Sequence, residues 1–490
     1  GAQPSRSRRQ HPPSLPSALA TARSPTAMPP VQRRVLIIGG SFAGLCVARD
    51  LRDDFLVTIV DAKEFFEYTP GVLRAYVKPK HLDALTFTLY PVIEERMGCK
   101  FIWGEVTELN GPERTATIKP MFSAQSEVLD FDFCIIACGC NFGPFHEWGE
   151  SLWFPTVHEK ARPNGSWPHL DERFLEGRRR HILEEYAAIQ ALEAKSSSIL
   201  VVGAGFIGVE WVTELRHFFP QLKLTIIDFL PQPLGPLPPG AAKYCSKYMK
   251  RAGIKQFYNM KYAPKEQTFW NKVELPNGAD KEYVCIGVKA SNYFMPKETL
   301  SEKGPGGGGW ILMDMTLAVE TREGNVWSAD DKGYARIYAV GDCNAGGISE
   351  PGKAPEDWPI PPIPKISYPG EEEAVIATKN VVKIDKLVYR GEKADLFGEP
   401  LEPATMHWPW GAGMFATSLG PHDACFVIGA NWQKGSGYTV VWGAPCAVQK
   451  EIIEASKVDE CANGMVGSVI WHFVHHTPVH LFGGGPRWGY

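Results

Sequence analysis

A glycine-rich turn at residues 199–210 constrains the fold of this chain more than any other segment. It reads ILVVGAGFIGVE, an apolar run followed by Gly203, Gly205 and Gly208 and then by a stretch with the pattern of a helix. In such a unit the first glycine permits a tight turn, the second lets the backbone approach a pyrophosphate, and the third lets the helix pack on the strand. The N–H groups at the start of the helix attract phosphate. The segment therefore predicts a dinucleotide-binding unit.

A similar turn occurs earlier in the chain. Residues 35–45 read VLIIGGSFAGL, with Ser41 in the place of the second glycine. Each turn is followed, after about twenty residues, by an acid at the end of the next apolar run: Asp61 in FLVTIVD and Asp228 in LKLTIID. Such a carboxylate can bind the ribose hydroxyls of a dinucleotide. Two such units indicate an enzyme that moves electrons between two dinucleotides, FAD and NAD(P)H being the obvious pair. The alternative is a pair of β-α-β units that bind nothing.

Three further apolar runs complete the pattern. Residues 133–139 (FCIIACG) and 283–289 (YVCIGVK) are expected to be the strands that close the two units. Residues 337–343 (IYAVGDC) read as a strand that ends in Gly341 and Asp342. A carboxylate at a strand end can bind hydroxyl groups, and a helix that follows directs the positive end of its dipole to the same place. This run predicts a further contact to a cofactor.

Length, charge and cysteine usage narrow the class of protein. A chain of 490 residues is long enough for two or three domains. The net charge of -4 gives no general attraction to nucleic acid, so no nucleic-acid partner is expected. The eleven cysteines include no C-x-x-C pair, which favours a reducing compartment and excludes the thiol route by which disulfide reductases pass on electrons. Cys46, Cys138 and Cys140 are interpreted as packing residues.

The first thirty residues differ in composition from the rest. They are rich in Pro, Ser, Ala and Arg and contain neither Asp nor Glu. This composition fits a mitochondrial or plastid transit segment and equally a disordered extension. Because Met28 lies just before the first apolar run, residues 1–27 also fit a precursor remnant or a translated leader. No apolar run of about eighteen residues occurs, so a membrane-spanning helix is not expected.

The order of the motifs resembles a known superfamily. GGSFAG, EFFEYTPGVLRA, ACG, GAGFIGVE and IYAVGDC follow one another as in the pyridine-nucleotide-dependent flavoproteins of glutathione reductase architecture. FEYTPGVLR at residues 66–74 resembles the branch of type II NADH dehydrogenases and the quinone-reducing homologues of apoptosis-inducing factor. The resemblance covers about residues 33–385 and implies an α/β fold of two nested Rossmann-like dinucleotide-binding domains plus a C-terminal α+β domain. In this branch a serine in the place of Ser41 is familiar, and its hydroxyl can bond a pyrophosphate.

The resemblance also gives expected domain boundaries. They are 1–30 for the extension, 31–198 and 312–385 for the two parts of the FAD-binding domain, 199–311 for the NAD-binding domain, and 386–490 for a C-terminal interface domain. In the last of these, GMFATSLG, ACFVIGA and GYTVVWGA read as strands and PCAVQKEIIEASKVDECANG as a helix. Relatives use such a domain for dimers or for membrane contact, so a homodimer or membership of a larger assembly is an open expectation.

The end of the chain is apolar and aromatic. GSVIWHFVHHTPVHLF at residues 467–482 indicates either a peripheral membrane anchor or a buried helix end, and the missing basic face favours the buried helix end. His472, His475, His476 and His480 are not expected to hold a metal, because no cysteine or acid completes a set with the usual ligand spacing.

The function implied by the resemblance is an FAD-dependent NADH:quinone oxidoreductase that does not pump protons. Glu210, directly after the second glycine turn, matches an acid near the nicotinamide and flavin of many relatives. Its simpler interpretation is a charge at a helix start. Asp228 favours NADH over NADPH, because a carboxylate repels a 2′-phosphate and the next residues, Phe229 and Leu230, bring no cation.

The segment at residues 365–384 departs from the family. Type II NADH dehydrogenases carry an alanine–glutamine pair there that contacts quinone, whereas this chain has Glu372 and Glu373. Lys365 and Tyr368 are expected to line the pocket instead. Together with Glu210 they are the predicted catalytic residues.

The expected contacts to FAD and NADH lie on the two glycine turns, on the acids that follow them, and on the neighbouring strand ends. The family motifs indicate these positions. They are Gly39, Gly40, Ser41, Phe42, Ala43, Gly44, Asp61, Ala62, Lys63, Arg74, Val106, Ala137, Gly139, Gly203, Gly205, Phe206, Ile207, Gly208, Glu210, Asp228, Gly287, Gly341 and Asp342.

Two other functions stay open from the sequence. A ferredoxin or monodehydroascorbate reductase uses the same halves with another acceptor. A structural or accessory subunit that has lost turnover is motivated by Ser41, by the altered helix and by insertions at residues 142–180 and 344–364, since long loops often bind neighbours. A peripheral place on the mitochondrial inner membrane is expected, with the plastid or the cytosol as alternatives.

Overall fold

The computed structural model describes most of the chain beyond the N-terminal extension. Residues from Arg33 onward form one compact unit, so the predicted domain boundaries stay predictions. The extension at residues 1–30 and most of both predicted insertions lie outside the described residues. Those described are 32–142, 153, 155, 171–235, 237–346, 365, 367–406, 414–429 and 438–473.

The first sheet has seven strands in the order β15-β8-β1-β2-β5-β6-β7. The neighbours from β15 to β5 are parallel, and β5, β6 and β7 are antiparallel. Strands β1 and β8 are almost continuously apolar because both of their faces are buried: Val35 and Ile37 share a core with α1 (Phe42–Leu51) and α8 (Ser367–Ile384), whereas Leu36 and Ile38 pack with residues of β5, β6 and the segment 294–319. The strands are β1 Arg34–Ile38, β2 Leu56–Asp61, β5 Lys100–Asn110, β6 Thr115–Pro120, β7 Glu127–Asp130, β8 Phe133–Ile136 and β15 Ile337–Ala339.

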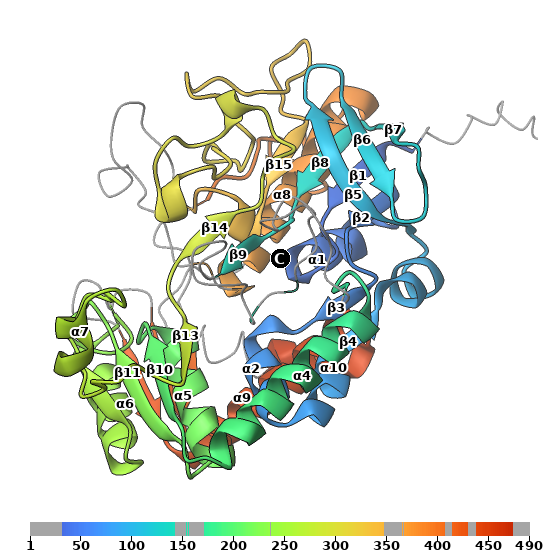
Figure 1. Ribbon diagram of the computed structural model, residues 1–490. Helices are drawn as coiled ribbons and strands as arrows, with labels where there is room; N and C mark the ends of the chain where they lie inside the picture. The colour runs from blue at the N-terminus through green and yellow to red at the C-terminus, as the bar shows by residue number, and fades with distance from the viewer. Residues whose placement is uncertain are drawn as a thin grey trace, which may run out of the picture. The chain divides into compact units, whose positions relative to one another are not determined.

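The second sheet is a parallel, four-stranded one in the order β12-β11-β10-β13. Its strands are β10 Ser198–Val202, β11 Lys223–Ile227, β12 Lys255–Phe257 and β13 Lys281–Val284. All of them come between β8 and β15 in the chain, as nested units require. Figure 1 shows this sheet in green, apart from β1, β8 and β15. The α/β class and the two Rossmann-type units are confirmed.

Two of the predicted strands are shorter than expected. The run at 133–139 forms a strand only as far as Ile136, and Gly139 then takes a positive φ of 68°. The run at 283–289 is interrupted at Gly287, with φ of 89°, before β14 (Val288–Ala290) pairs antiparallel with β9 (Cys140–Phe142). Glycine adopts such angles without the strain that another residue would have, so Gly139 and Gly287 let the chain turn at these positions.

The helices follow the two glycine turns and fill the spaces beside the sheets. Helix α1 packs directly against α8. Helix α4 is not among the elements that the sequence predicts. A small antiparallel pair, β3 (Phe65–Glu67) with β4 (Thr86–Thr88), precedes the second turn. The helices are α1 Phe42–Leu51, α2 Val72–Val77, α3 Leu82–Leu85, α4 Leu175–Glu193, α5 Phe206–Phe218, α6 Pro239–Arg251, α7 Gln267–Lys272 and α8 Ser367–Ile384.

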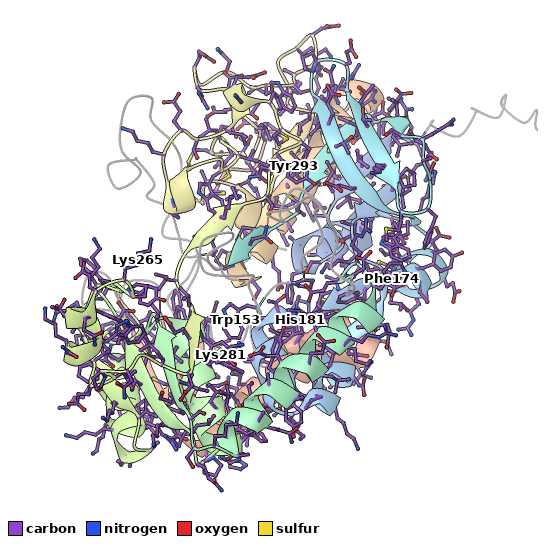
Figure 2. The ribbon with its side chains drawn as sticks, in the orientation of Figure 1. Trp153, Phe174, His181, Lys265, Lys281 and Tyr293 are labelled. Atoms are coloured by element: carbon purple, nitrogen blue, oxygen red, sulfur yellow. The ribbon has the colours of Figure 1, made fainter. Side chains whose placement is uncertain are left out.

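Helix α4 is held by one buried guanidinium. Arg178 Nε donates to Glu67 Oε2 at 2.8 Å, and Nη1 donates to Tyr76 Oη at 2.9 Å. Trp153 and His181, both labelled in Figure 2, lie beside Tyr76 with ring centroids 6.2 and 6.0 Å from it. Because buried charges persist only when they are paired, this cluster fixes α4 against β3 and α2.

The C-terminal region is the predicted α+β unit. Strands β16 (Met414–Ser418), β17 (Ala424–Ile428) and β18 (Thr439–Trp442) form an antiparallel sheet. Helices α9 (Ala444–Cys461) and α10 (Met465–Trp471) follow and pack against each other.

Of the segment 467–482, for which a buried helix end is expected, the structure describes residues 467–473, and Val469, Ile470, His472 and Phe473 are exposed there. Met465, Val466, Val469 and Phe473 are 80%, 66%, 66% and 72% exposed, whereas Trp471 is buried. We call these four residues, three in α10 and Phe473 just beyond its end, the apolar face of α10. Among the described residues, every helix is too short or too polar to cross a membrane. His475, His476 and His480 lie outside the described residues.

Candidate functional site

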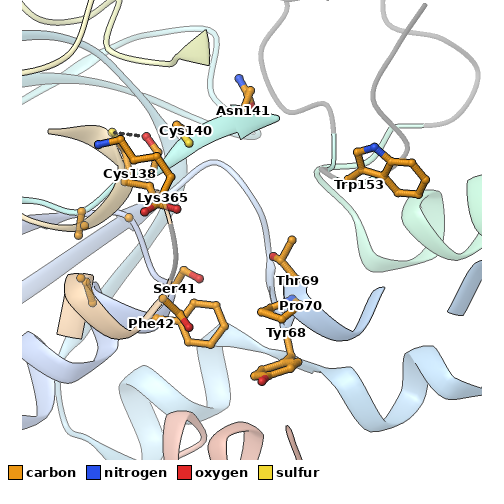
Figure 3. A pocket seen from close by; sticks show the side chains of 18 of the residues that line it. Ser41, Phe42, Tyr68, Thr69, Pro70, Cys138, Cys140, Asn141, Trp153 and Lys365 are labelled. Atoms are coloured by element: carbon orange, nitrogen blue, oxygen red, sulfur yellow. Dashed lines mark hydrogen bonds between the residues drawn. The ribbon is translucent and has the colours of Figure 1, made fainter. Parts of the chain in front are cut away.

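A cavity of about 560 Å³ lies where both glycine turns, the end of β15, the start of α8 and the C-terminal region meet. This volume falls within the range of sites for small molecules and cofactors. Figure 3 shows Ser41 and Phe42 of the first turn opposite Thr69 and Pro70, with Cys138 and Lys365 beyond them. The predicted residues that line the cavity are Gly39, Ser41, Phe42, Ala43, Asp61, Ala62, Lys63, Val106, Ala137, Gly139, Gly205, Phe206, Ile207, Glu210, Gly341, Asp342 and Lys365.

The first turn needs glycine at two positions. A Cβ atom on Gly39, whose φ is 111°, would lie 2.4 Å from the carbonyl oxygen of Ala137. A Cβ atom on Gly44 would lie 1.9 Å from the carbonyl oxygen of Gly39, so strand, turn and α1 approach one another as closely as backbone allows. Ser41 stands at the N-cap of α1, but its side chain makes no capping hydrogen bond and lines the cavity.

Asp61 is held against this turn by two backbone groups. Its Oδ2 accepts a hydrogen bond from the N–H of Gly40 at 2.7 Å, and its Oδ1 accepts one from the N–H of Lys63 at 2.8 Å. The carboxylate therefore keeps a fixed position at the edge of the cavity.

The second turn repeats this arrangement. Asp228 Oδ2 accepts from the N–H of Ala204 at 2.5 Å, and Oδ1 accepts from the N–H of Leu230 at 2.7 Å. A Cβ atom on Gly208 would lie 1.8 Å from the carbonyl oxygen of Gly203. A Cβ atom on Gly205 would meet nothing within 4 Å, so the backbone there is open to a ligand.

Several predicted contacts lie outside the cavity lining. Arg74 pairs with Glu214 at 2.9 Å and with Glu451, and its contact to a cofactor stays a prediction. Tyr368 belongs to α8, but its side chain lies outside the description. The other predicted residues that do not line the cavity are Gly40, Gly44, Gly203, Gly208, Asp228 and Gly287.

The end of β15 presents a carboxylate to the cavity. Burial raises the pKa of Asp342 to about 6, and the nearby Lys365 opposes that rise. Lys365 Nζ donates to the carbonyl oxygen of Asn344 at 2.5 Å and lies 4.7 Å above the ring of Trp310. Glu372 and Glu373, expected at the quinone position, are buried and do not line the cavity.

The C-terminal region contributes residues that the sequence did not indicate. Glu210 Oε1 accepts from the N–H of Ser418 at 2.8 Å and pairs with Lys450 Nζ of α9. The ring of Phe206 stacks on that of Phe415, with centroids 5.9 Å apart and planes 10° apart. Contacts between residues more than two hundred positions apart leave no local signal in a single sequence.

Comparisons with known proteins decide the family. The profile of the family described as "Pyridine nucleotide-disulphide oxidoreductase" matches residues 33–360. The chain belongs to this family. It is 27% identical over 325 residues to ferroptosis suppressor protein 1 of Xenopus laevis, covering 63% of this chain and 74% of that protein. It is 21% identical over 459 residues to a type II NADH:quinone oxidoreductase of Staphylococcus aureus, covering 89% of this chain and 97% of that protein.

Solved structures of low identity agree on the fold. The sulfide:quinone oxidoreductase from Aquifex aeolicus matches with a TM-score of 0.66 at 14% identity, over 92% of this chain and 95% of that one. At this identity the likeness shows the fold alone.

This member of the pyridine nucleotide-disulphide oxidoreductase family holds its cavity cysteines as thiols. A hydrogen bond with Cys343 and burial raise the pKa of Cys138 well above its usual value, and burial does the same for Cys140. Because the thiolate is the reactive form, neither is prepared to attack a disulfide at neutral pH. The geometry is consistent with the packing role predicted for both.

Proposed function

We propose that this chain is an FAD-dependent NADH oxidoreductase that passes electrons to a quinone without pumping protons. The observation that carries the proposal is a cavity reached by two glycine turns, each with its own carboxylate fixed on the turn. The type II NADH:quinone oxidoreductase named above supports the choice of donor and acceptor. Family membership alone leaves both open.

The residues around the first turn fit FAD. Close packing at Gly39 and Gly44 brings the N–H groups at the start of α1 to the cavity edge, where a pyrophosphate is best bound. Each oxygen of Asp61 accepts one hydrogen bond, and a carboxylate can accept about four in all, so Asp61 can also accept hydrogen bonds from ribose hydroxyls. Asp342 faces the cavity as the acceptor for a hydroxyl-bearing chain.

The second turn fits NADH. The open backbone at Gly205 and the start of α5 suit a second pyrophosphate, and Asp228 suits the adenosine ribose beyond the cavity. FAD would supply the ring that takes a hydride and later gives up electrons. Glu210, paired with Lys450, borders the same cavity and would orient the nicotinamide, while the stacked rings beside it exclude water.

We also propose a peripheral place on a membrane. The apolar face of α10 lies exposed next to Trp471, which lines the cavity. A quinone is dissolved in lipid, so a protein that reduces it gains from an apolar contact there. We propose the mitochondrial inner membrane as this place, and the acid-free composition of the first thirty residues fits a transit segment for a mitochondrion or a plastid.

Purified protein tests the proposal. We expect a yellow protein whose visible absorption bleaches on anaerobic addition of NADH and returns on addition of a short-chain quinone. Ferricyanide and a plant-type ferredoxin serve as alternative acceptors. Bound FAD that NADH does not bleach contradicts the oxidoreductase and favours an accessory subunit, whereas bleaching without reoxidation by quinone contradicts the acceptor alone.

A further inference from the structure

Glu373 of α8 lies directly behind the turn that carries Asp342. Its side chain is 1% exposed, and Oε2 accepts hydrogen bonds from the N–H of Gly341 at 2.5 Å and from Nδ2 of Asn344 at 2.6 Å. A Cβ atom on Gly370 would lie 3.0 Å from the Cα atom of Gly341, so α8 rests on this turn. One oxygen of the Glu373 carboxyl group thus holds both ends of the segment Gly341–Asn344.

The same turn is tied on its other side. Asn344 Oδ1 accepts from the N–H of Gly346 at 2.7 Å, and its carbonyl oxygen accepts from Lys365 Nζ at 2.5 Å. Gly341 has a φ of 76°, which lets the chain bend sharply and turn Asp342 toward the cavity. Without an acceptor on α8, the buried N–H of Gly341 and the amide of Asn344 each lose a partner.

We propose that Glu373 is a positioning residue for bound FAD, which fixes the Gly341–Asn344 turn so that Asp342 meets the cofactor. The inference rests on the proposed function, since it takes FAD as the ligand of this cavity. The sequence suggested that Glu373 replaces a quinone contact; the structure instead places it behind the cavity wall.

The charge of Glu373 gives this role a signature that a purely structural role lacks. Burial raises the pKa of Glu373 to about 8, so the carboxyl is neutral at pH 7 and ionises in mildly alkaline solution. Ionisation adds a negative charge close to a cofactor that carries a negative pyrophosphate, and FAD should then bind more weakly. The charged side chains on the surrounding elements are Asp342 on the turn, Lys365 before α8, Glu371 on α8, Lys457 and Glu460 on α9, and Arg49 on α1.

The test measures FAD binding to apoprotein between pH 6 and 9.5, without NADH or quinone. Glu373→Leu removes the acceptor and should raise the dissociation constant about tenfold or more at every pH. Glu373→Gln keeps an acceptor oxygen without the ionisation. It should match the wild type at pH 6.5 and abolish the weakening that the wild type shows above pH 8.

A matched control is Glu320→Gln. Burial raises the pKa of Glu320 to about 7, with Asp314 adding to the rise, but among the described residues Glu320 is not part of the cavity lining. It should leave the FAD dissociation constant and its pH profile unchanged. Melting temperatures of all apoproteins show which variants fold. If Glu373→Leu does not fold, the comparison of Glu373→Gln with the wild type and with Glu320→Gln is sufficient for the test.

The outcomes separate the two proposals. A wild type that binds no FAD overturns the proposed function and this inference with it. A wild type that binds FAD, with equal pH profiles for Glu373→Gln and wild type, overturns this inference only.

Discussion

We expect the choice of nucleotide to depend on Asp228, a carboxylate whose place is fixed by two backbone hydrogen bonds. Asp228 accepts one bond on each oxygen, from Ala204 and Leu230, and has capacity for two more. Ribose hydroxyls would therefore add to the bonds already present. A 2′-phosphate would meet the carboxylate at contact distance, and the next residue, Phe229, is apolar and 73% exposed and so brings no cation.

Replacing this carboxylate should change the preferred nucleotide. The double variant Asp228→Ser with Phe229→Arg removes the negative charge and adds a positive one, and the exposed phenylalanine is lost without loss of packing. A charge-assisted hydrogen bond contributes about 1.5 to 3 kcal/mol, which corresponds to about ten- to a hundredfold in affinity. We expect NADH to bind weaker by that factor and NADPH to become a donor.

The assay compares kcat/KM for NADH and NADPH at fixed quinone. Asp61→Ser is the matched control, because Asp61 makes the equivalent pair of bonds in the first turn. It should lower FAD retention and leave the ratio of the two nucleotides unchanged. If the wild type oxidises NADPH as fast and at as low a concentration as NADH, the role assigned to Asp228 is wrong.

Three further predictions concern Lys450, Gly205 and the apolar face of α10. Lys450→Met leaves Glu210 without the cation that pairs with it and should lower kcat/KM for NADH about tenfold at unchanged FAD content. Lys450→Arg keeps a cation there and should keep kcat/KM near that of the wild type. Equal rates in the two variants contradict the role of this pair. In Gly205→Ala the added Cβ atom meets no protein atom within 4 Å, so the melting temperature should stay unchanged. The methyl group blocks the approach of a pyrophosphate and should raise KM for NADH. A lowered melting temperature with unchanged KM refutes this prediction. Val466→Asp on the apolar face of α10 should reduce sedimentation with liposomes and leave NADH oxidation by ferricyanide intact; unchanged sedimentation argues against membrane contact through α10.

The sequence predicted what depends on local pattern. Both glycine turns are built as expected, because Gly39 and Gly203 need positive φ and Gly44 and Gly208 need the absence of a Cβ atom. Backbone constraints of this kind act between residues a few positions apart. A single sequence therefore shows them.

The parts that sequence reasoning missed depend on long-range contacts. Arg74 ends a family motif, but its ion pairs with Glu214 and Glu451 come from distant elements and leave no local signal in the sequence. The apolar residues of α10 were read as buried because the sequence lacks a basic face, yet Val466 and Val469 are mostly exposed. Burial and pairing are properties of the assembled fold.

The cavity cannot be complete without the C-terminal region, although the family profile ends at residue 360. Glu210 is only 8% exposed in the whole chain, and a carboxylate this deeply buried needs groups that pair with it. Its partners, Ser418 and Lys450, lie beyond that boundary. The second dinucleotide-binding unit thus takes these two partners of its acid from the C-terminal region. A chain that ends after α8 would keep both glycine turns but leave this acid unpaired at the place where the nicotinamide is expected.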